Sequence, residues 1–288
     1  MANTLKQLIN LFKLRIGIIM SVTALVTMVV TPGREVALWE GVVLAITVLL
    51  SAASAGAFNQ YYEHDLDGLM KRTQNRPFVT GALMRGNGWL MTISGILVFG
   101  VAWAGYSLNG YAAAYIFLGA FFYAVVYTVW LKRRSSTNIV IGGAAGSFAV
   151  LAGAAVVDPN LSPIPITLAI VLFLWTPSHF WSLAIAKHDD YVAAGIPMLP
   201  VVVGDKTAAK AVLGNTVLLL IFSILPFFYG LGWLYLLGAL SGGGYFLYRS
   251  LCLLFEPTPK VAMKNFFASL IQLCSLLLFA VLDTWLVN

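Results

Sequence analysis

A polar segment that ends an apolar stretch carries side chains whose types and spacing suit metal chemistry. It reads NQYYEHDLDGLMKRTQNRPFVTG, residues 59–81, and places Asn59, Glu63 and Asp67 at every fourth position. On a continuous helix these positions drift only about 40° per step, so an amide and two carboxylates face one way, while Asp65 faces another. Such hard oxygen ligands suit Mg²⁺. The spacing therefore predicts a magnesium site at Asn59, Glu63 and Asp67.

Three cations follow this candidate metal site within a few turns: Lys71, Arg72 and Arg76. They can neutralise the carboxylates in a solvated loop. They can also bind the oxygens of a metal-bridged diphosphate, for which arginine offers a planar fork. Both interpretations stay open, and the second predicts that these three residues bind diphosphate.

A second polar segment reads FLWTPSHFWSLAIAKHDDYVAAGIPMLPVVVG, residues 173–204. On a continuous helix His179, Lys187 and Asp190 share one face, at positions i, i+8 and i+11. His179 lies inside an apolar run, where an ionisable residue is costly and is a functional candidate. The alternative is a histidine that is hydrogen-bonded to a neighbouring helix. We predict that the two segments form half-sites facing one cavity, with Lys187 and Asp190 in the catalytic group.

The composition indicates where these segments lie. Hydrophobic residues make up 60% of the 288 positions and charged residues 10%, with a mean hydropathy of +0.89, whereas soluble domains are about 25% charged. We therefore predict an all-α polytopic membrane protein of a single domain, residues 1–288, with about nine transmembrane helices around a central cavity that opens to the cytoplasmic side. The expected spans are 14–31, 38–58, 89–107, 110–131, 138–157, 164–186, 211–230, 232–250 and 265–287.

The lysines and arginines test this division into spans. Nearly all of them precede span 1 or follow spans 2, 4, 6 and 8, and Arg34 alone falls on the other side. Because cytoplasmic loops carry an excess of Lys and Arg, the N-terminus is expected in the cytoplasm and the C-terminus on the opposite side. No signal or transit peptide is evident, which favours a bacterial inner (plasma) membrane.

Two other features of the composition point to no further chemistry. The net charge of +6 is explained by membrane topology, so no nucleic-acid partner is expected, and the lipid bilayer is the expected surrounding. Cys252 and Cys274 fit no metal motif, and we expect both to be small side chains facing lipid or core.

The pattern at Asn59, Glu63 and Asp67 resembles the first aspartate-rich motif of the UbiA-type intramembrane prenyltransferases. The continuation KRTQNRP, with WTPSHFW and DYVAAGIPMLPVV in the second segment, resembles more specifically the protoheme IX farnesyltransferase (haem O synthase) family. The likeness spans essentially the whole chain. Glu63 stands where Asp is frequent, and the second motif keeps only Asp189 and Asp190, which puts a second Mg²⁺ site in doubt.

This resemblance implies an Mg²⁺-dependent transfer of a farnesyl group from farnesyl diphosphate to a vinyl group of protohaem IX (haem B), with water addition, giving haem O and diphosphate. Haem B is then a substrate, and a haem A synthase or a terminal-oxidase assembly factor is the partner that the pathway implies. His179, Trp181 and Tyr61 would contact the haem acceptor, and Tyr62 and Phe180 are further candidates for the cavity wall. His179 has two open roles: ligand of the haem iron, or polar group orienting the acceptor or water.

Three rival functions remain. The nearest is a prenyltransferase for a quinone precursor or another ring acceptor, which the HFW segment and the scarcity of acids in the second motif disfavour. The second is a secondary transporter, but transporters place ionisable groups near mid-membrane, and here nearly all charges lie at helix ends. The third is a haem-handling subunit without catalysis, which the intact Asn59, Glu63 and Asp67 face disfavours.

Overall fold

The computed structural model describes residues 2–286, with side chains from residue 5 onward, and within that range it contains helices and no strand. The elements are α1 (Ala2–Leu11), α2 (Leu14–Val30), α3 (Leu38–Tyr62), α4 (His64–Leu69), α5 (Asn87–Ser107), α6 (Gly110–Phe121), the π-helix η1 (Phe122–Leu131), α7 (Asn138–Gly142), α8 (Ala144–Val157), α9 (Pro163–Ala186), α10 (His188–Ala193), α11 (Leu199–Val203), α12 (Asp205–Phe228), α13 (Trp233–Phe255) and α14 (Pro259–Leu286). The expected all-helical fold is confirmed.

The membrane-spanning helices are fewer by hydropathy than the nine expected. Seven are long and apolar enough to cross a bilayer: Leu38–Tyr62, Asn87–Ser107, Gly110–Leu131, Asn138–Val157, Pro163–Ala186, Asp205–Phe228 and Pro259–Leu286. The pair Leu5–Leu11 and Leu14–Val30, bent by 53°, makes an eighth. Helix α13 covers the remaining expected range, but three consecutive glycines and Arg249 lower its hydropathy. The chain is thus an integral membrane protein, with seven to eight candidate spans within residues 2–286.

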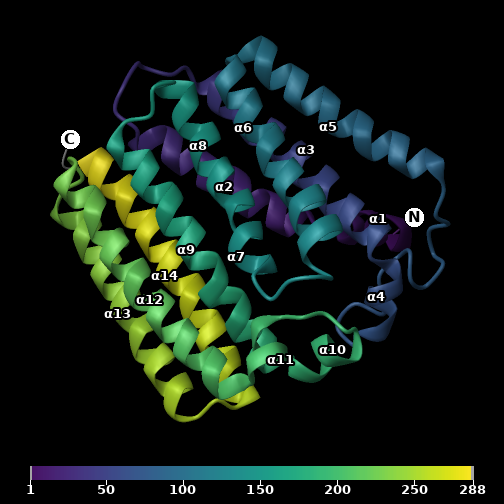
Figure 1. Ribbon diagram of the computed structural model, residues 1–288. Helices are drawn as coiled ribbons and strands as arrows, with labels where there is room; N and C mark the ends of the chain where they lie inside the picture. Colours follow the sequence, from purple (N-terminus) through teal and green to yellow (C-terminus); the bar gives the residue numbers. More distant parts are fainter. Residues whose placement is uncertain (1, 287–288) are drawn as a thin grey trace.

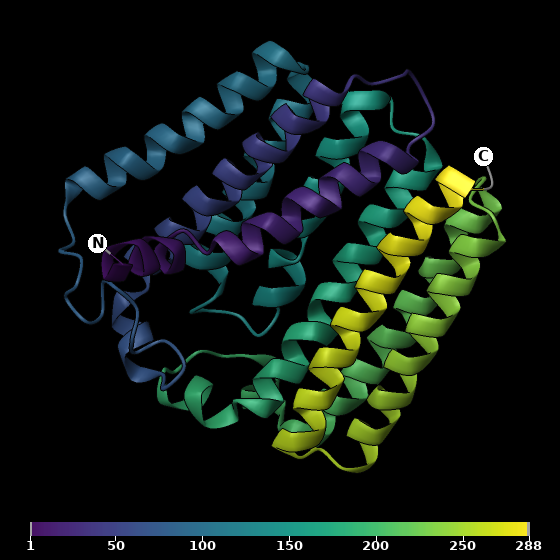
Figure 2. The same cartoon turned by 180° about the vertical axis from the view of Figure 1, so that it is seen from behind.

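The helices form two groups that meet along α2, α8 and α9 (Figure 1). Helices α2, α3, α5, α6 and α8 pack in one group, and α9, α12, α13 and α14 pack in the other, with α8 against α9 and α2 against α14 at the junction. The view from behind shows the same junction from the side of α2 and α14 (Figure 2). Short loops join α5 to α6, α12 to α13 and α13 to α14, whereas the two polar segments join α3 to α5 and α9 to α12.

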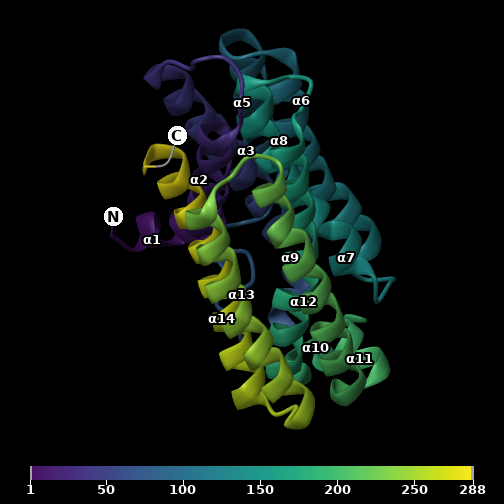
Figure 3. The ribbon, with the colours of Figure 1, turned by 90° about the vertical axis from the view of Figure 1, so that its left-hand side faces the viewer.

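The short helices mark one end of this bundle. Helices α4, α10 and α11 lie there (Figure 1), whereas α14 ends at the opposite end (Figures 1 and 3). Both polar segments follow long helices, α3 and α9, that run toward this end. The fold therefore gathers the two candidate half-sites at one end of the bundle.

Close helix approach depends on small residues, as is usual in membranes. A Cβ atom on Gly153 of α8 would lie 2.0 Å from the carbonyl oxygen of Ala24 on α2. A Cβ on Gly238 of α13 would lie 2.3 Å from the Cβ of Phe279 on α14. Because the obstacle at Gly153 is backbone, the α2–α8 contact cannot accept a larger residue without moving a helix.

We expect Gly153→Ala to lower the free energy of unfolding by about 3 kcal/mol or more, since overpacking forces the backbone apart. The matched control is Gly244→Ala in α13, where no atom lies within 4 Å of the added Cβ. Thermal unfolding of both variants in detergent measures the difference. Equal midpoints for Gly153→Ala and wild type would contradict the close approach.

Candidate active site

The first polar segment begins where α3 gives way to α4. Helix α3 ends at Tyr62, and Glu63 joins it to α4 with φ −96° and ψ 14°. The predicted single continuous helix is therefore wrong at this residue. The backbone bonds nevertheless keep the i+4 register, because Glu63 N–H donates to Asn59 O (3.0 Å) and Asp67 N–H donates to Glu63 O (2.9 Å). Asn59, Glu63 and Asp67 are all buried, at most 2% exposed, while Asp65 is exposed.

Each member of this triad is held by a cation from a different part of the chain. Lys13 Nζ donates to Asn59 Oδ1 at 2.6 Å. Arg76 donates to Asp67 Oδ2 at 2.6 Å, and Lys132 Nζ is paired with Glu63 Oε2. Lys13 precedes α2 and Lys132 follows η1, so tertiary packing alone brings them to the triad. The result is a buried cluster with three cations against two carboxylates.

The carboxylates retain oxygens for a further ligand. Glu63 Oε1 and Asp67 Oδ1 are sealed from solvent and have no hydrogen-bond partner among the described residues. Buried polar atoms are nearly always paired, so two such oxygens in one cluster call for a physical reason. Carboxylate and amide oxygens are the donors that Mg²⁺ takes, with its remaining positions filled by water and substrate phosphate. Residues 2–286 hold no group of three or more His, Cys, Asp or Glu suited to a metal, and this triad itself consists of two carboxylates and one amide.

Asp65 lies outside this cluster, as its helical position predicts. Arg133 forms two parallel hydrogen bonds to it, 2.9 Å to Oδ2 and 2.8 Å to Oδ1. Partial burial opposes ionisation of Asp65, but the Arg133 guanidinium and nearby backbone N–H groups keep its pKa below the usual range. The same hydrogen bonds raise the pKa of Arg133. The exposed Arg133–Asp65 pair can therefore be compared with the buried Lys132–Glu63 pair, which differs from it in access to water.

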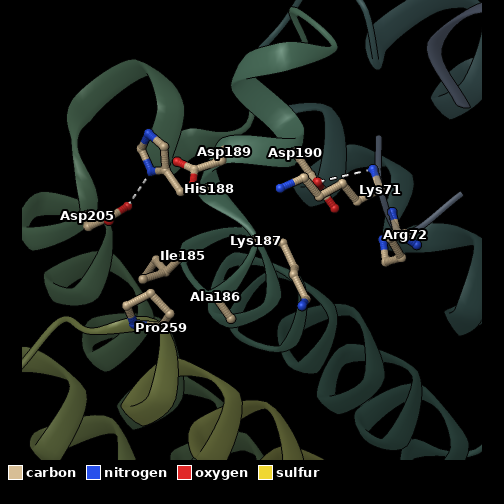
Figure 4. A pocket seen from close by; sticks show the side chains of 10 residues that line it. All are labelled: Lys71, Arg72, Ile185, Ala186, Lys187, His188, Asp189, Asp190, Asp205 and Pro259. Atoms are coloured by element: carbon tan, nitrogen blue, oxygen red, sulfur yellow. Dashed lines mark hydrogen bonds and ion pairs between the residues drawn. The ribbon is translucent and has the colours of Figure 1, made fainter. Parts of the chain in front are cut away.

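A cavity of about 630 Å³ joins the two polar segments (Figure 4). Lys71 and Arg72 line it from the first segment, and Lys187 and Asp190 line it from the second. The two segments touch directly, because the Lys71 backbone N–H donates to Asp190 Oδ1 at 3.2 Å. The other lining residues are Ile185, Ala186, His188, Asp189, Asp205 and Pro259. The two polar segments therefore meet at one cavity, to which the first segment contributes two cations and the second contributes both cations and carboxylates. Asn59, Glu63 and Asp67 are not among its lining residues.

The predicted shared helical face of His179, Lys187 and Asp190 is wrong. Helix α9 ends at Ala186, Lys187 leaves the helical conformation (φ −125°, ψ 34°), and α10 starts at His188. Lys187 and Asp190 consequently lie at the cavity, whereas His179 is buried between α9 and α14. There its ring stacks on Trp175 and Phe266, each at 4.2 Å between centroids. Nδ1 of His179 is also hydrogen-bonded to Ser269 of α14. This contact agrees with the second interpretation of His179, a histidine bonded to a neighbouring helix.

The aromatic candidates do not form one wall. Tyr61 packs edge-on against Phe78 at 5.7 Å and lies under the Arg85 guanidinium, in a cluster with α1 and α5. Tyr62 lies beneath Arg133. Trp181 packs with Met70 and residues of α10 and α11, near the cavity, and its indole N–H is buried without a partner. Phe180 contacts the His179 ring edge-on at 5.1 Å.

Sequence reasoning missed the cluster residues that come from distant helices. Lys13 and Lys132 were assigned to membrane topology alone. Tyr123 and Thr128 also take part, since Lys13 Nζ donates to Tyr123 OH at 3.0 Å and Asn59 Nδ2 donates to Thr128 Oγ1 at 3.0 Å. Both lie on the π-helix η1, whose wider turn is frequent at functional sites. The available signal was that both lysines adjoin spans at the same membrane side as Asn59.

Comparison with known proteins finds relatives that align with nearly the whole chain. Residues 20–271 match the model of the UbiA prenyltransferase family. The chain is 54% identical over 277 residues, 96% of either chain, to a protein of Paramagnetospirillum magneticum named protoheme IX farnesyltransferase 2. It is 46% identical, with the same coverage, to protoheme IX farnesyltransferase 1 of that organism.

Solved structures share the fold at low sequence identity. A digeranylgeranylglyceryl phosphate synthase matches with a TM-score of 0.81 and 19% identity, covering 98% of this chain and 99% of that chain. A UbiA homologue from Archaeoglobus fulgidus bound to GPP and Mg²⁺ matches with a TM-score of 0.71 and 14% identity, covering 97% and 100%. With a family match across most of the chain and relatives above 30% identity, the chain belongs to the UbiA prenyltransferase family.

Proposed function

We propose that this enzyme transfers a farnesyl group from farnesyl diphosphate to a vinyl group of haem B, with addition of water, to give haem O and diphosphate. The observation that carries the proposal is the 54% identity, over 96% of both chains, to a protein named protoheme IX farnesyltransferase 2. The buried carboxylates with their ring of cations suit the diphosphate half of this reaction.

The diphosphate end of the donor has two groups of cations to bind it, one at the buried triad and one at the cavity between the two polar segments. Mg²⁺ bound by Asn59, Glu63 and Asp67 would supply Lewis-acid stabilisation of the charge on the departing diphosphate. Lys13, Lys132 and Arg76 already contact this triad, and Lys71, Arg72 and Lys187 line the cavity. Cations aimed in advance at a developing charge lower the barrier without reorganisation. The allylic carbon–oxygen bond breaks as these residues take up the negative charge.

The rest of the reaction needs an apolar site that limits access of water. The vinyl carbon of haem B attacks the allylic carbon of the farnesyl group and forms a carbon–carbon bond. Water then adds to the cation left beside the porphyrin and releases one proton. Aromatic and aliphatic side chains of α9 and α14, among them the buried Trp175, supply apolar surroundings that limit early capture of the allylic carbon by water.

We place the end with α4, α10 and α11 in the cytoplasm of a bacterium, with the N-terminus on that side and the end of α14 on the other. Eight cations at or near the candidate site precede or follow spans at that end: Lys13, Lys71, Arg72, Arg76, Arg85, Lys132, Arg133 and Lys187. Cytoplasmic loops carry this excess. Farnesyl diphosphate, a charged donor, would then enter from the cytoplasm.

Incubation of the protein in nanodiscs with haem B, farnesyl diphosphate and Mg²⁺ tests the proposal, with the haem followed by mass. We expect the haem to gain the mass of one farnesyl and one hydroxyl group, and loss of the product when EDTA removes the metal. Prenylation of an aromatic acid with no haem product would overturn the acceptor. Full turnover in EDTA would overturn the metal requirement.

A further inference from the structure

A strained turn joins α1 to α2. Helix α1 ends at Leu11, α2 begins at Leu14, and the two helices are bent by 53°. Between them Lys13 has φ 47° and ψ 41°, the left-handed conformation that bulky side chains rarely adopt. Within residues 2–286, Leu161 is the other non-glycine residue with a positive φ. A strained residue persists only where its surroundings hold it, so neighbouring contacts must stabilise the turn at Lys13.

Gln60 of α3 holds this turn. Its Nε2 donates to the carbonyl oxygens of Asn10 at 2.6 Å and of Leu11 at 3.2 Å, at the end of α1, where carbonyls lack their usual helical partners. Because both acceptors are carbonyls, the –NH₂ group of the Gln60 amide must face them. Gln60 is 2% exposed, so water does not replace these bonds. Helix α1 is thus fastened to α3 at the residue next to Asn59 (Figure 1).

The same face of α3 receives the Lys13 side chain. Gly56, Asn59 and Gln60 are spaced i, i+3 and i+4, so they share one side of the helix. A Cβ atom on Gly56 would lie 3.2 Å from both Cβ and Cδ of Lys13, so the lysine stem crosses α3 where no side chain projects. The Nζ of Lys13 then donates to Asn59 Oδ1 at 2.6 Å and to Tyr123 OH at 3.0 Å. One face of α3 therefore supports the turn, the stem and the ammonium group of Lys13.

The place of the Lys13 ammonium depends on this turn. The backbone conformation of a residue sets the direction of its side chain. If the turn relaxed to a right-handed helix, the Cα–Cβ bond of Lys13 would change direction and carry the stem away from Gly56. A lysine side chain has a flexible four-carbon stem and is not rigid by itself. The contacts that fix the turn therefore limit where the ammonium can lie.

We propose that Gln60 is a positioning residue of the active site, which holds the left-handed turn and thereby keeps the Lys13 ammonium beside Asn59 to bind the diphosphate. The inference rests on the proposed function for the role of Lys13 as a diphosphate ligand. Gln60 uses its only donor group on the backbone of α1. Its effect on diphosphate binding therefore passes through Lys13, and it disappears when Lys13 has no ammonium.

A double-mutant cycle on diphosphate binding tests this dependence. Inorganic diphosphate with Mg²⁺ is titrated calorimetrically into nanodisc-embedded wild type, Lys13→Met, Gln60→Met and the double variant. We expect Lys13→Met to weaken binding about 10- to 100-fold, as loss of a hydrogen bond to a charged group does. Gln60→Met weakens it about 10-fold, in the range of coupling between residues of one network. The double variant binds no more weakly than Lys13→Met.

Two further variants control this cycle. Gln272 of α14 is also fully buried, but neither end of its amide has a hydrogen-bond partner among the described residues. Gln272→Met makes the same exchange of side chains away from the triad, and we expect it to bind diphosphate as wild type does. Gln60→Asn keeps a buried amide that is one methylene too short for the α1 carbonyls. It should bind as weakly as Gln60→Met, and it tests the same contact if Gln60→Met does not fold.

The outcomes separate this inference from the proposed function. If loss of the Gln60 amide weakens binding by the same factor with and without the Lys13 ammonium, Gln60 is only structural and the inference is overturned, even where wild type farnesylates haem. Unchanged binding in both Gln60 variants also overturns it. A loss that appears only when Lys13 is present, in a protein that does not farnesylate haem, would contradict the proposed acceptor and leave the positioning role of Gln60 standing.

Discussion

Glu63→Gln and Asp67→Asn each lower the turnover number by about 10³-fold, because Lewis-acid stabilisation is worth several kcal/mol and each 1.36 kcal/mol is tenfold in rate. Each substitution keeps the size of the side chain and removes a negative oxygen that Mg²⁺ would bind. Both residues are buried at the bundle end and keep an oxygen without a partner. Turnover of haem B with farnesyl diphosphate, measured over a range of Mg²⁺ concentrations, checks this result.

Asp65→Asn is the matched control for these variants. Asp65 lies in α4 between Glu63 and Asp67 in sequence, but its side chain is exposed and paired with Arg133. We expect turnover near that of wild type and an unchanged Mg²⁺ dependence. All three variants should elute as folded protein and unfold cooperatively. If both Glu63→Gln and Asp67→Asn turned over as fast as wild type, the hypothesis of a metal site at these residues would be contradicted.

Lys132→Met lowers the free energy of unfolding by about 3–5 kcal/mol in EDTA, since removing one partner strands a buried charge. Glu63 is fully buried and Lys132 is 8% exposed, so water cannot replace the lost cation. Mg²⁺ bound at Glu63 would supply positive charge in its place. We therefore expect Mg²⁺ to raise the thermal midpoint of Lys132→Met more than that of wild type, as followed by unfolding in detergent.

The neighbouring residue provides the control for this prediction. Arg133 pairs with Asp65 at the surface, where both side chains are about one-third to one-half exposed. Such exposed pairs contribute about 0–1 kcal/mol, so Arg133→Met should unfold near the wild-type midpoint with no special response to Mg²⁺. If Lys132→Met and wild type had the same free energy of unfolding in EDTA, the buried ion pair would contribute nothing to stability.

The amino-acid sequence determined the class of fold and predicted a candidate group of residues for the first half-site. Long apolar runs can satisfy their backbone in lipid only as helices, so composition alone predicted an all-helical membrane bundle. The i, i+4, i+8 spacing of Asn59, Glu63 and Asp67 predicted that these side chains face one way and Asp65 another, and in the structure the three are buried while Asp65 is exposed. These inferences succeeded because they depend on local periodicity and on the solvent.

Local periodicity failed where a helix ended without a strong signal. Nothing between His179 and Asp190 breaks the helical pattern in sequence, yet the helix stops at Ala186 so that Lys187 and Asp190 can turn toward Lys71 and Arg72. The competing interaction is tertiary, including the Lys71 N–H bond to Asp190. The span count has the same limit, since α13 is less apolar than a free-standing span and packs instead against α12 and α14.

Only the tertiary structure decided which partners surround the reactive groups. Lys13 lies 46 residues from Asn59, and Lys132 lies 69 residues from Glu63, while Ser269 lies 90 residues from His179. No sequence periodicity connects positions so far apart. Their meeting follows from the packing of α2, η1 and α14 against α3 and α9, where small residues let backbones approach and each buried polar group must find a partner. The sequence thus identified the groups that could do chemistry, and helix packing determined which charged and polar side chains lie next to them.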